Sequence, residues 1–508
     1  MSMKQLKAAD KIVSEILSSA QKLVEAVKQA AQQGDSFDSC ERRVWESVRH
    51  IGYSSLELLI ALQGSGDLGA TTPTTAGETL HRSTAPAACT LRSIFGTHAF
   101  RQYTYSPGAK EAIALRPLDA RLSLPAHRWS YLLQEFSQMF CAESAFGLAA
   151  ENLGTVFGGR FSVETLEAVN RQMGADAGLF LDALPTPPAQ EEGEVLVFSC
   201  DGKGVPLVRE DAAKVPAFET ACKRPGNRRM ASVASVYSVD RFQRTAADIV
   251  AALFRDERAP DEELLPRPLP QFKHTTAHFA KQYEEGDEAL TVSATHEAFG
   301  WASGEIARRH QTDQPLVVLM DGQTSLWSTA ELYSFSGTVV EILDIVHVSH
   351  YVWSAAKLLE TTRAAQLAFT RQRLTQILEG NVAGVVRGLR AIATRRPLRG
   401  QCREDFAVLC NYLAHHATRM RYDEYLQAGY PIASGVIEGA CRHLVKDRME
   451  RSGMRWTLEG ARHMLAVRAT FQSSYWKQFH TQRIQREQAT LHPHRDLIAN
   501  YTPLQIAI

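Results

Sequence analysis

The chain has 508 residues, 44% of them hydrophobic and 22% charged, which is typical of a folded protein with roughly two to four domains. It has no run of about 18 apolar residues and no signal-peptide core at its N-terminus, so we expect neither a membrane span nor secretion. The eight cysteines never form a CxxC pair, which argues against a closed zinc site and a disulfide framework. We therefore expect a cytoplasmic protein with reduced, mostly buried thiols.

The formal net charge is zero, but the charges are distributed unevenly. Residues 361–508 contain 22 Lys and Arg against 11 Asp and Glu, a net charge of +11. The first 360 residues therefore contain 34 Lys and Arg against 45 Asp and Glu, a net charge of −11. A basic C-terminal third is typical both of a solvated face and of a surface that binds nucleic acid. Charge alone leaves both interpretations open.

Residues 1–63 have the apolar spacing of two consecutive helices. Helical intervals run through residues 3–33, and a second helical pattern covers residues 37–62, so this segment is expected to form a helical hairpin. The hairpin either packs into the core of its own chain or mediates dimerisation. Residues 64–90 are rich in Gly, Thr and Ala and contain few bulky apolar residues, which predicts a flexible linker.

Residues 91–184 combine short β-like runs with helical patterns. Near the end of this region, Ser162 stands where an N-cap would, with Glu164 following it. The helix that it begins is either the second helix of a helix-turn-helix, in which case the region binds DNA, or a member of an ordinary helix pair. A Pro- and Glu-rich segment, residues 185–194, then marks a boundary.

Beyond residue 194 the pattern changes to continuous apolar runs separated by helical segments. Such runs predict strands whose sheet is covered on both faces. Two of them stop at an Asp followed by Gly, the first at Asp201 and the second at Asp321. Open α/β sheets bind ligands at this end of their strands, and a divalent cation compensates the cost of burying an ionised Asp there. Because Asp-Gly is also a common turn, each Asp alone fits a structural role as well.

A helix is predicted to begin within residues 430–456, with Glu438 in its first turn, where the helix dipole favours a negative charge. Two strand-end carboxylates and a third carboxylate from a packed helix can hold the two metal ions of phosphoryl-transfer enzymes. A basic ridge that suits a duplex backbone follows Glu438 and consists of Arg442, Lys446, Arg448, Arg451 and Arg455. The alternative is an amphipathic helix with a solvated basic face.

Several segments carry a resemblance to a known family, namely CDGKGVPLV, VVLMDG, EILDIVHVSHYVW and above all YPIASGVIEGACRHLVKDRMERSGMRW. Between about residues 194 and 476 the chain resembles the DDE transposases of bacterial insertion sequences in the ISKra group, distant relatives of the Mutator transposases. The resemblance implies an RNase H-like fold with one Asp on the first strand, one on the fourth and a Glu on a following helix. Those catalytic and metal-binding roles fall on Asp201, Asp321 and Glu438, with two Mg²⁺ or Mn²⁺ ions as cofactors.

Mutator-like families also carry a Cys or Asp, then two residues, then a His, just after the second Asp. Asp344 and His347 match this spacing. The resemblance implies that His347 assists at the DNA ends, with His350 as a second candidate. Because Asp344 also ends an apolar strand, it is an alternative to Asp321 as the second carboxylate.

The sequence thus predicts an α/β RNase H-like catalytic core with a helical insertion, preceded by a mainly α-helical N-terminal region. The first part of the core is expected over residues 194–348 and the insertion over 349–428. The Glu438 helix and a C-terminal helix are expected over 429–480, and a tail over 481–508.

The function that follows is a DNA transposase that cleaves phosphodiesters at the ends of its element and joins the 3′-OH to target DNA, without a covalent protein intermediate. Its expected partners are the terminal inverted repeats, the target DNA and further copies of the chain, because two ends must be held together in a homodimer or larger complex at the nucleoid. Two alternatives stay open: an RNase H-like nuclease without strand transfer, and a non-catalytic DNA-binding protein derived from a transposase.

Overall fold

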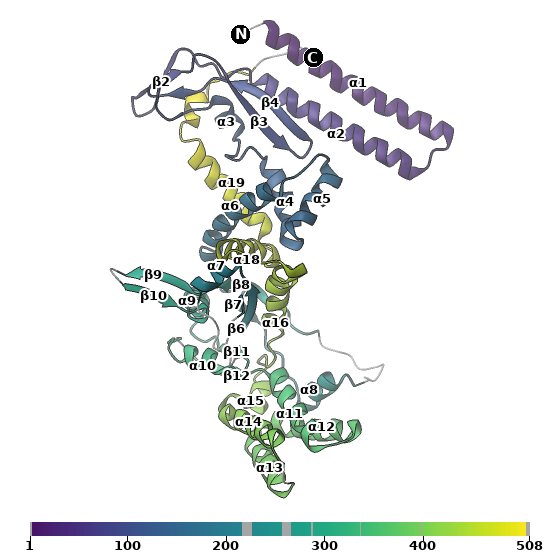
Figure 1. Ribbon diagram of the computed structural model, residues 1–508, viewed down its shortest axis with the longest axis vertical. Coiled ribbons are helices and arrows are strands. Elements are labelled where there is room, and N and C mark those ends of the chain that lie inside the picture. Colours follow the sequence, from purple (N-terminus) through teal and green to yellow (C-terminus); the bar gives the residue numbers. More distant parts are fainter. Residues whose placement is uncertain are drawn as a thin grey trace. The chain divides into compact units, whose positions relative to one another are not determined.

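The computed structural model describes residues 3–215, 226–256, 266–285, 288–335, 337–396 and 398–503. The chain divides into two compact units (Figure 1). The first unit consists of Met1–Asn170 and Trp476–Ile508, and the second of Arg171–Tyr475. None of the helices in the described ranges combines the length and the apolar character that crossing a membrane requires.

The first unit begins with two long helices, α1 (Met3–Gln33) and α2 (Phe37–Leu62), which lie side by side and form the hairpin that the apolar spacing predicts (Figure 1). The chain reverses at Gly34, whose φ of +70° is accessible to glycine at no steric cost. Ser36 then caps α2, because its side chain accepts a hydrogen bond from the backbone N–H of Ser39.

The structure differs from the flexible linker expected for residues 64–90. This segment contains β1 (Thr71–Pro73) and β2 (Thr79–Arg82), which join β5 (Tyr105–Ser106) in a three-stranded sheet. Leu80 and Tyr105 are completely buried in a small core of their own. A few buried side chains are enough to order a turn-rich segment, and a composition of Gly and Thr does not reveal them.

The remaining elements of the first unit are a β-hairpin and a group of helices. The hairpin pairs β3 (Ala87–Ser93) with β4 (Gly96–Gln102). The helices are α3 (Pro117–Leu122), α4 (Tyr131–Glu143), α5 (Phe146–Phe157), α6 (Val163–Asp182, which continues into the second unit), α19 (Trp476–Leu491) and η4 (Arg495–Ile498).

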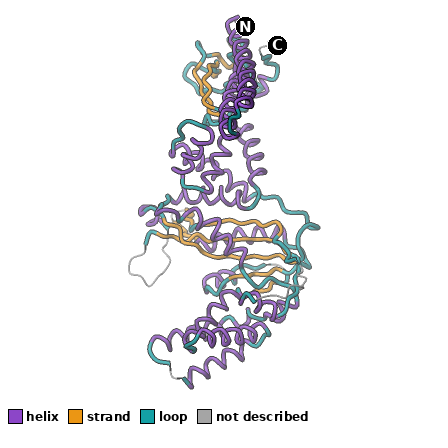
Figure 2. Tube along the Cα trace, turned by 90° about the vertical axis from the view of Figure 1, so that its right-hand side faces the viewer, coloured by secondary structure: helices purple, strands orange, loops and turns teal. Residues whose placement is uncertain are grey.

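The second unit is a mixed α/β structure built on a five-stranded sheet (Figure 2). Its strands, in spatial order, are β12 (Val339–Leu343), β11 (Leu316–Met320), β6 (Val195–Pro206), β7 (Arg228–Val239) and β8 (Gln271–His278). Strands β6, β11 and β12 are parallel to one another, whereas β6, β7 and β8 alternate in direction. The apolar half of β6 and the whole of β11 are buried, as the continuous apolar runs predict.

Short elements connect these strands. They are α7 (Arg209–Lys214), α8 (Ala246–Phe254), β9 (Lys281–Glu285), β10 (Glu288–Val292), α9 (Ala294–Arg309) and α10 (Thr324–Ala330). Helix α9 packs on the sheet through Phe299, which contacts Phe198 of β6 edge to face with ring centroids 4.9 Å apart.

A run of helices separates β12 from the segment that carries Glu438. It consists of α11 (Ile345–Leu359), α12 (Arg363–Leu378), α13 (Val382–Arg395), α14 (Gln401–His415), η1 (Ala417–Arg419) and α15 (Tyr422–Gln427). Their buried side chains belong to the same hydrophobic core as the sheet. The chain then continues through α16 (Gly435–Ala440), the π-helical turn η2 (Cys441–Lys446), α17 (Asp447–Met449), η3 (Arg451–Gly453) and α18 (Leu458–Gln472).

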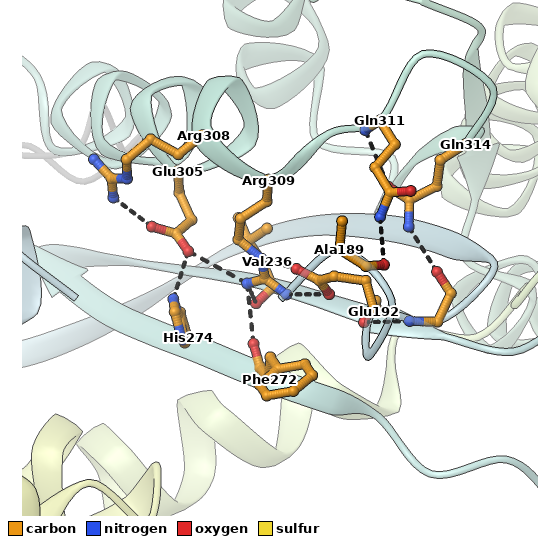
Figure 3. A network of polar contacts seen from close by, with 12 residues as sticks. Ala189, Glu192, Val236, Phe272, His274, Glu305, Arg308, Arg309, Gln311 and Gln314 are labelled. Atoms are coloured by element: carbon orange, nitrogen blue, oxygen red, sulfur yellow. Dashed lines mark hydrogen bonds and ion pairs between the residues drawn. The ribbon is translucent and has the colours of Figure 1, made fainter. Parts of the chain in front are cut away.

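A buried ionic network fastens the edge of the sheet (Figure 3). Arg309 of α9 binds both carboxylate oxygens of Glu192, with distances of 2.7 Å from Nε and 3.0 Å from Nη2. The same guanidinium lies 3.3 Å from Glu305, whose carboxylate also contacts Nδ1 of His274 on β8. Burial alone would raise the pKa of Glu305, but His274 and the neighbouring arginines lower it to about 2. The network therefore ties β8, α9 and the segment before β6 together through paired charges.

Replacing Glu305 with Gln tests this network. The pKa of Glu305 lies at about 2 instead of its ordinary 4.5, so its charge stabilises the fold fully above pH 4.5 and progressively less as the pH falls toward 2. We expect E305Q to lower the free energy of unfolding by on the order of 3 kcal/mol at pH 7, and the difference from the parent to shrink in acid. Calorimetry from pH 7 to pH 2 measures it.

The matched control is Glu424→Gln, which removes an exposed ion pair with Arg421 and should cost less than about 1 kcal/mol at every pH. A loss in E305Q that is equally large at pH 7 and pH 2 would contradict a stabilising role for the charge.

Candidate active site

Three acidic residues stand at one edge of the sheet. Asp201 lies on β6 where its buried half ends, and Asp321 and Asp344 directly follow β11 and β12. The register pairs Val318 with Phe198, and continuing it by three residues places Asp321 beside Asp201. The pairing of Met320 with Leu343 likewise places Asp344 on the other side of Asp321. Neighbouring strands lie about 4.8 Å apart, so these three residues occupy adjacent backbone positions. Among the described residues, however, the group of metal-ligand atoms that converge within 4.8 Å consists of Asp344, His347 and Glu438, and it includes neither Asp201 nor Asp321.

Asp344 is completely buried, and four donors engage its two oxygens. Oδ1 accepts hydrogen bonds from the backbone N–H of Val346 at 3.0 Å and of Ser434 at 3.2 Å. Oδ2 accepts one from the hydroxyl of Ser434 at 2.9 Å and lies 2.8 Å from Nδ1 of His347. Burial would raise the pKa of Asp344, but these donors hold it below its ordinary value.

Glu438 approaches the same place from helix α16. Its backbone N–H donates to the carbonyl of Ser434 at 3.1 Å, so the helical turn that carries Glu438 begins at the residue that binds Asp344. Ligand atoms of Asp344, His347 and Glu438 lie within 4.8 Å of one another. Burial and the negative charge of Asp344 raise the pKa of Glu438, while His347 opposes this shift.

Asp201 and Asp321 share this electrostatic environment. Burial and the charge of Asp201 raise the pKa of Asp321, against a hydrogen bond of 2.9 Å from the backbone N–H of Gln323. Asp201 also raises the pKa of Glu438. In this crowded set of carboxylates, His347 supplies positive charge to both Asp321 and Glu438. Such an oxygen-rich site suits a hard divalent cation, which would offset the mutual repulsion.

Aromatic side chains from the helical segment cover the end of β11. Tyr412 of α14 packs directly over Gly322 and stacks on Tyr351 of α11, with ring centroids 3.7 Å apart. Nε1 of Trp327 on α10 donates a hydrogen bond to the backbone carbonyl of Asp321 at 2.6 Å. No sequence pattern marks these aromatic residues, apart from the glycine that follows Asp321.

The basic residues after Glu438 do not form one continuous ridge. Arg442, Lys446, Arg451 and Arg455 are exposed, but Arg448 is completely buried, with its guanidinium 4.7 Å from the ring centroid of Trp456. Arg448 follows Cys441 by seven residues and Leu444 by four, so helical spacing groups it with these buried side chains, and its assignment to an exposed ridge is wrong.

Comparisons with known proteins give one distant similarity to report. No family model matches the chain, and neither does any curated protein sequence. Among solved structures, the chain is similar to the Drosophila P element transposase strand transfer complex, with 10% sequence identity and a TM-score of 0.23 over 68% of this chain and 79% of that chain. A TM-score of this size does not establish a shared fold.

A methyl group at Gly322 tests how tightly the site is covered. A Cβ there would lie 2.2 Å from the nearest ring atoms of Tyr412, so the stacked tyrosines would have to move. We expect Gly322→Ala to lower the free energy of unfolding by about 1–3 kcal/mol in urea titrations.

Gly435 is the matched control, since a Cβ there meets no atom within 4 Å. Gly435→Ala should leave stability unchanged or raise it by less than about 1 kcal/mol. Equal stability of the two variants would show that Tyr412 does not press on Gly322.

Proposed function

We propose that the chain is a DDE-type DNA transposase of the bacterial insertion-sequence kind, related to the ISKra group. The observation that carries the proposal is the adjacent placement of Asp201 and Asp321 at one sheet edge with Glu438 on a helix that returns to it. In chain order, Asp201 lies on the first strand of the sheet, Asp321 follows the fourth, and Glu438 lies on a helix after the fifth. These are the positions that the resemblance to an RNase H-like core implies.

We propose that Asp201, Asp321 and Glu438 hold two Mg²⁺ or Mn²⁺ ions, because carboxylate oxygens are the ligands that these cations prefer. When bound, such ions activate an attacking oxygen and stabilise a leaving oxygen. His347 is held through Nδ1 by Asp344, which directs Nε2 away from that carboxylate. Its half-exposed ring is then suited to a hydrogen bond with a phosphate at the DNA end.

We assign the second metal-binding carboxylate to Asp321 and a positioning role to Asp344. Asp344 belongs to the group whose ligand atoms lie within 4.8 Å. However, both of its oxygens already accept hydrogen bonds, and a metal would have to replace donors from His347 or Ser434. Asp321 accepts one hydrogen bond from Gln323 and has a raised pKa, which fits a carboxylate that a cation would stabilise.

The exposed residues Arg442, Lys446, Arg451 and Arg455 are proposed to contact the DNA backbone beside the site. The partners are then the terminal inverted repeats and target DNA, in a homodimer or larger complex at the nucleoid. Two functions compete with this proposal. An RNase H-like nuclease would cleave without joining, and a non-catalytic descendant of a transposase would only bind DNA.

Strand transfer is the reaction that tests the proposal. Oligonucleotides from the borders of the element that encodes the chain, each ending in a 3′-OH, are incubated with supercoiled plasmid and Mg²⁺ or Mn²⁺. Joined products are expected from the parent. Asp201→Asn, Asp321→Asn and Glu438→Gln should each reduce their rate by about 10³-fold or more, because each removes a ligand charge.

Asp313→Asn is the matched control, since Asp313 is exposed and lies eight residues before Asp321. Cleavage without joined products would favour the nuclease. DNA binding that is insensitive to chelator, with no cleavage in any metal, would favour the non-catalytic descendant.

The assignment of Asp344 predicts a different kinetic defect. Asp344→Asn and Ser434→Ala loosen His347 and the start of α16, so the Mn²⁺ concentration for half-maximal rate should rise about 10- to 100-fold while the rate at saturating Mn²⁺ is largely kept. Asp321→Asn should stay inactive at every Mn²⁺ concentration. The control is Ser354→Ala, an exposed position on α11. The two roles would be reversed if high Mn²⁺ restored the rate of Asp321→Asn but no Mn²⁺ concentration restored the rate of Asp344→Asn.

A further inference from the structure

Positive charge is concentrated in one stretch of the helical segment between β12 and α16. Residues 380–403 contain six arginines and no lysine, aspartate or glutamate. They supply +6 of the net charge of +11 that residues 361–508 carry. A run of like charges is often only a solvated face, so its arrangement in the structure decides whether it forms a binding surface.

Helix α13 turns three of these arginines away from the hydrophobic core. Its buried side chains recur at helical intervals and are Val382, Val385, Val386 and Leu389. Arg387, Arg390 and Arg395 are exposed. Each residue turns an α-helix by about 100°, so these three lie within about 140° of one another on the side opposite the buried residues. Ala391 and Thr394, which lie between them, are exposed too, so no described element of the chain covers this side.

Helix α14 packs against α13 and adds a fourth arginine to this surface. Nη2 of Arg390 donates a hydrogen bond to Oδ1 of Asn411 on α14 at 3.2 Å. Arg403 is exposed and lies eight residues before Asn411, which places both residues on the same side of α14. Arg387, Arg390, Arg395 and Arg403 therefore form one surface, called here the arginine face.

Within the described part of the chain, no carboxylate forms an ion pair with the arginine face. Two arginines of the helical segment outside this face do pair, one with Asp256 and one with Glu360. The two carboxylates that follow the face in α14 are Glu404 and Asp405, and Asp405 accepts a hydrogen bond from Nε2 of Gln401 at 2.8 Å. Like charges that share a surface repel one another, so an anion that binds between them stabilises the surface.

The side chains between the arginines argue against a protein or a membrane as the partner. Besides its arginines, α13 exposes Ala383, Ala391 and Thr394, which are all small. The core of a protein–protein interface is rich in aromatic and other large apolar residues, and a helix that binds a membrane surface inserts such residues into it. Small side chains instead let a phosphate backbone approach the helix closely.

The spacing and the type of these charges fit the backbone of a duplex. Arg387 and Arg395 are eight residues apart, which is about 12 Å along the helix axis. Duplex DNA carries one phosphate charge per roughly 1.7 Å of its axis, so about seven phosphates lie within that length. All the charges of the arginine face are guanidinium groups, which bind phosphate oxygens in a bidentate manner that lysine does not reproduce.

We propose that the arginine face binds the phosphate backbone of duplex DNA, independently of the base sequence. The choice of DNA rests on the proposed function, and the proposal adds a contact surface on α13 and α14 to the residues that follow Glu438. Contacts to phosphates position a duplex and carry no sequence information, so this surface would hold any DNA that the site acts on.

The test is the salt dependence of DNA binding by the full chain, measured by fluorescence anisotropy in EDTA on a duplex of roughly 30 base pairs of random sequence. Each phosphate contact contributes about 0.9 to the slope of log K against log salt concentration. Arg387→Gln/Arg390→Gln/Arg395→Gln should lower this slope by about 2–3 and raise the Kd about 10-fold or more at roughly 100 mM salt. The corresponding triple lysine variant keeps the charges and should retain most of the slope.

The matched control removes three exposed arginines that already pair with carboxylates, namely Arg42, Arg43 and Arg421. Their triple glutamine variant loses the same net charge and should keep the parental slope. If the three glutamines unfold α13, Arg395→Gln alone should still lower the slope by about 1.

The proposal is overturned by a parent that does not bind duplex DNA, by a parental slope in the α13 variant, by an equal loss in the control, or by a loss confined to duplex RNA. Because EDTA removes metal ions, the readout does not depend on catalysis. A parent that joins DNA although its α13 variant keeps the full slope refutes the arginine face alone. A parent that joins no DNA although its α13 variant loses slope refutes the transposase proposal alone.

Discussion

The hydrogen bonds between Asp344 and Ser434 are the interaction on which the rest of the candidate site depends. They connect residues 90 positions apart, and together with the backbone bond from Ile345 to Ile432 they close the whole helical segment into a loop whose ends meet. Closing a long loop costs conformational entropy, and buried hydrogen bonds to a carboxylate are strong enough to help offset it. Glu438 follows Ser434 by four residues, so its position beside the strand ends follows from this closure.

The helical segment between β12 and α16 therefore helps to build the site. Its buried residues share the core of the sheet, and Tyr422 and Tyr425 donate hydrogen bonds from their hydroxyls to carbonyls of β12 at 2.7 Å and 3.0 Å. Tyr351 and Tyr412 then cover the end of β11 beside Asp321. A substitution that loosens the packing of these helices would therefore displace the carboxylates, because one continuous hydrophobic core connects the helices to the sheet.

The sequence predicts those parts of the structure that local patterns encode. Continuous apolar runs predict the central strands, and the Asp that ends each run marks the sheet edge where Asp201, Asp321 and Asp344 lie. Long-range and irregular features escape such patterns. The contact of Asp344 with Ser434, for example, has no local signal. The burial of Arg448 is different, because its spacing from the buried Cys441 and Leu444 is that of one helical face. Strands β1 and β2 are missed for a related reason, since a handful of buried residues orders a segment with the composition of a linker.

Asp344 and Asp321 differ in how the charge of each carboxylate is compensated. Neighbouring carboxylates repel one another, and burial strengthens the repulsion. Asp344 is compensated by four protein donors, and its pKa is lowered. Asp321 is not compensated to the same degree, because one backbone donor opposes both burial and the charge of Asp201, and its pKa is raised. Hydrogen bonds thus stabilise the negative charge of Asp344, whereas the negative charge of its neighbour Asp321 is only partly stabilised. A divalent cation would be favoured where the compensation is incomplete, and on this physical ground we propose Asp321 as the metal ligand and Asp344 as the anchor.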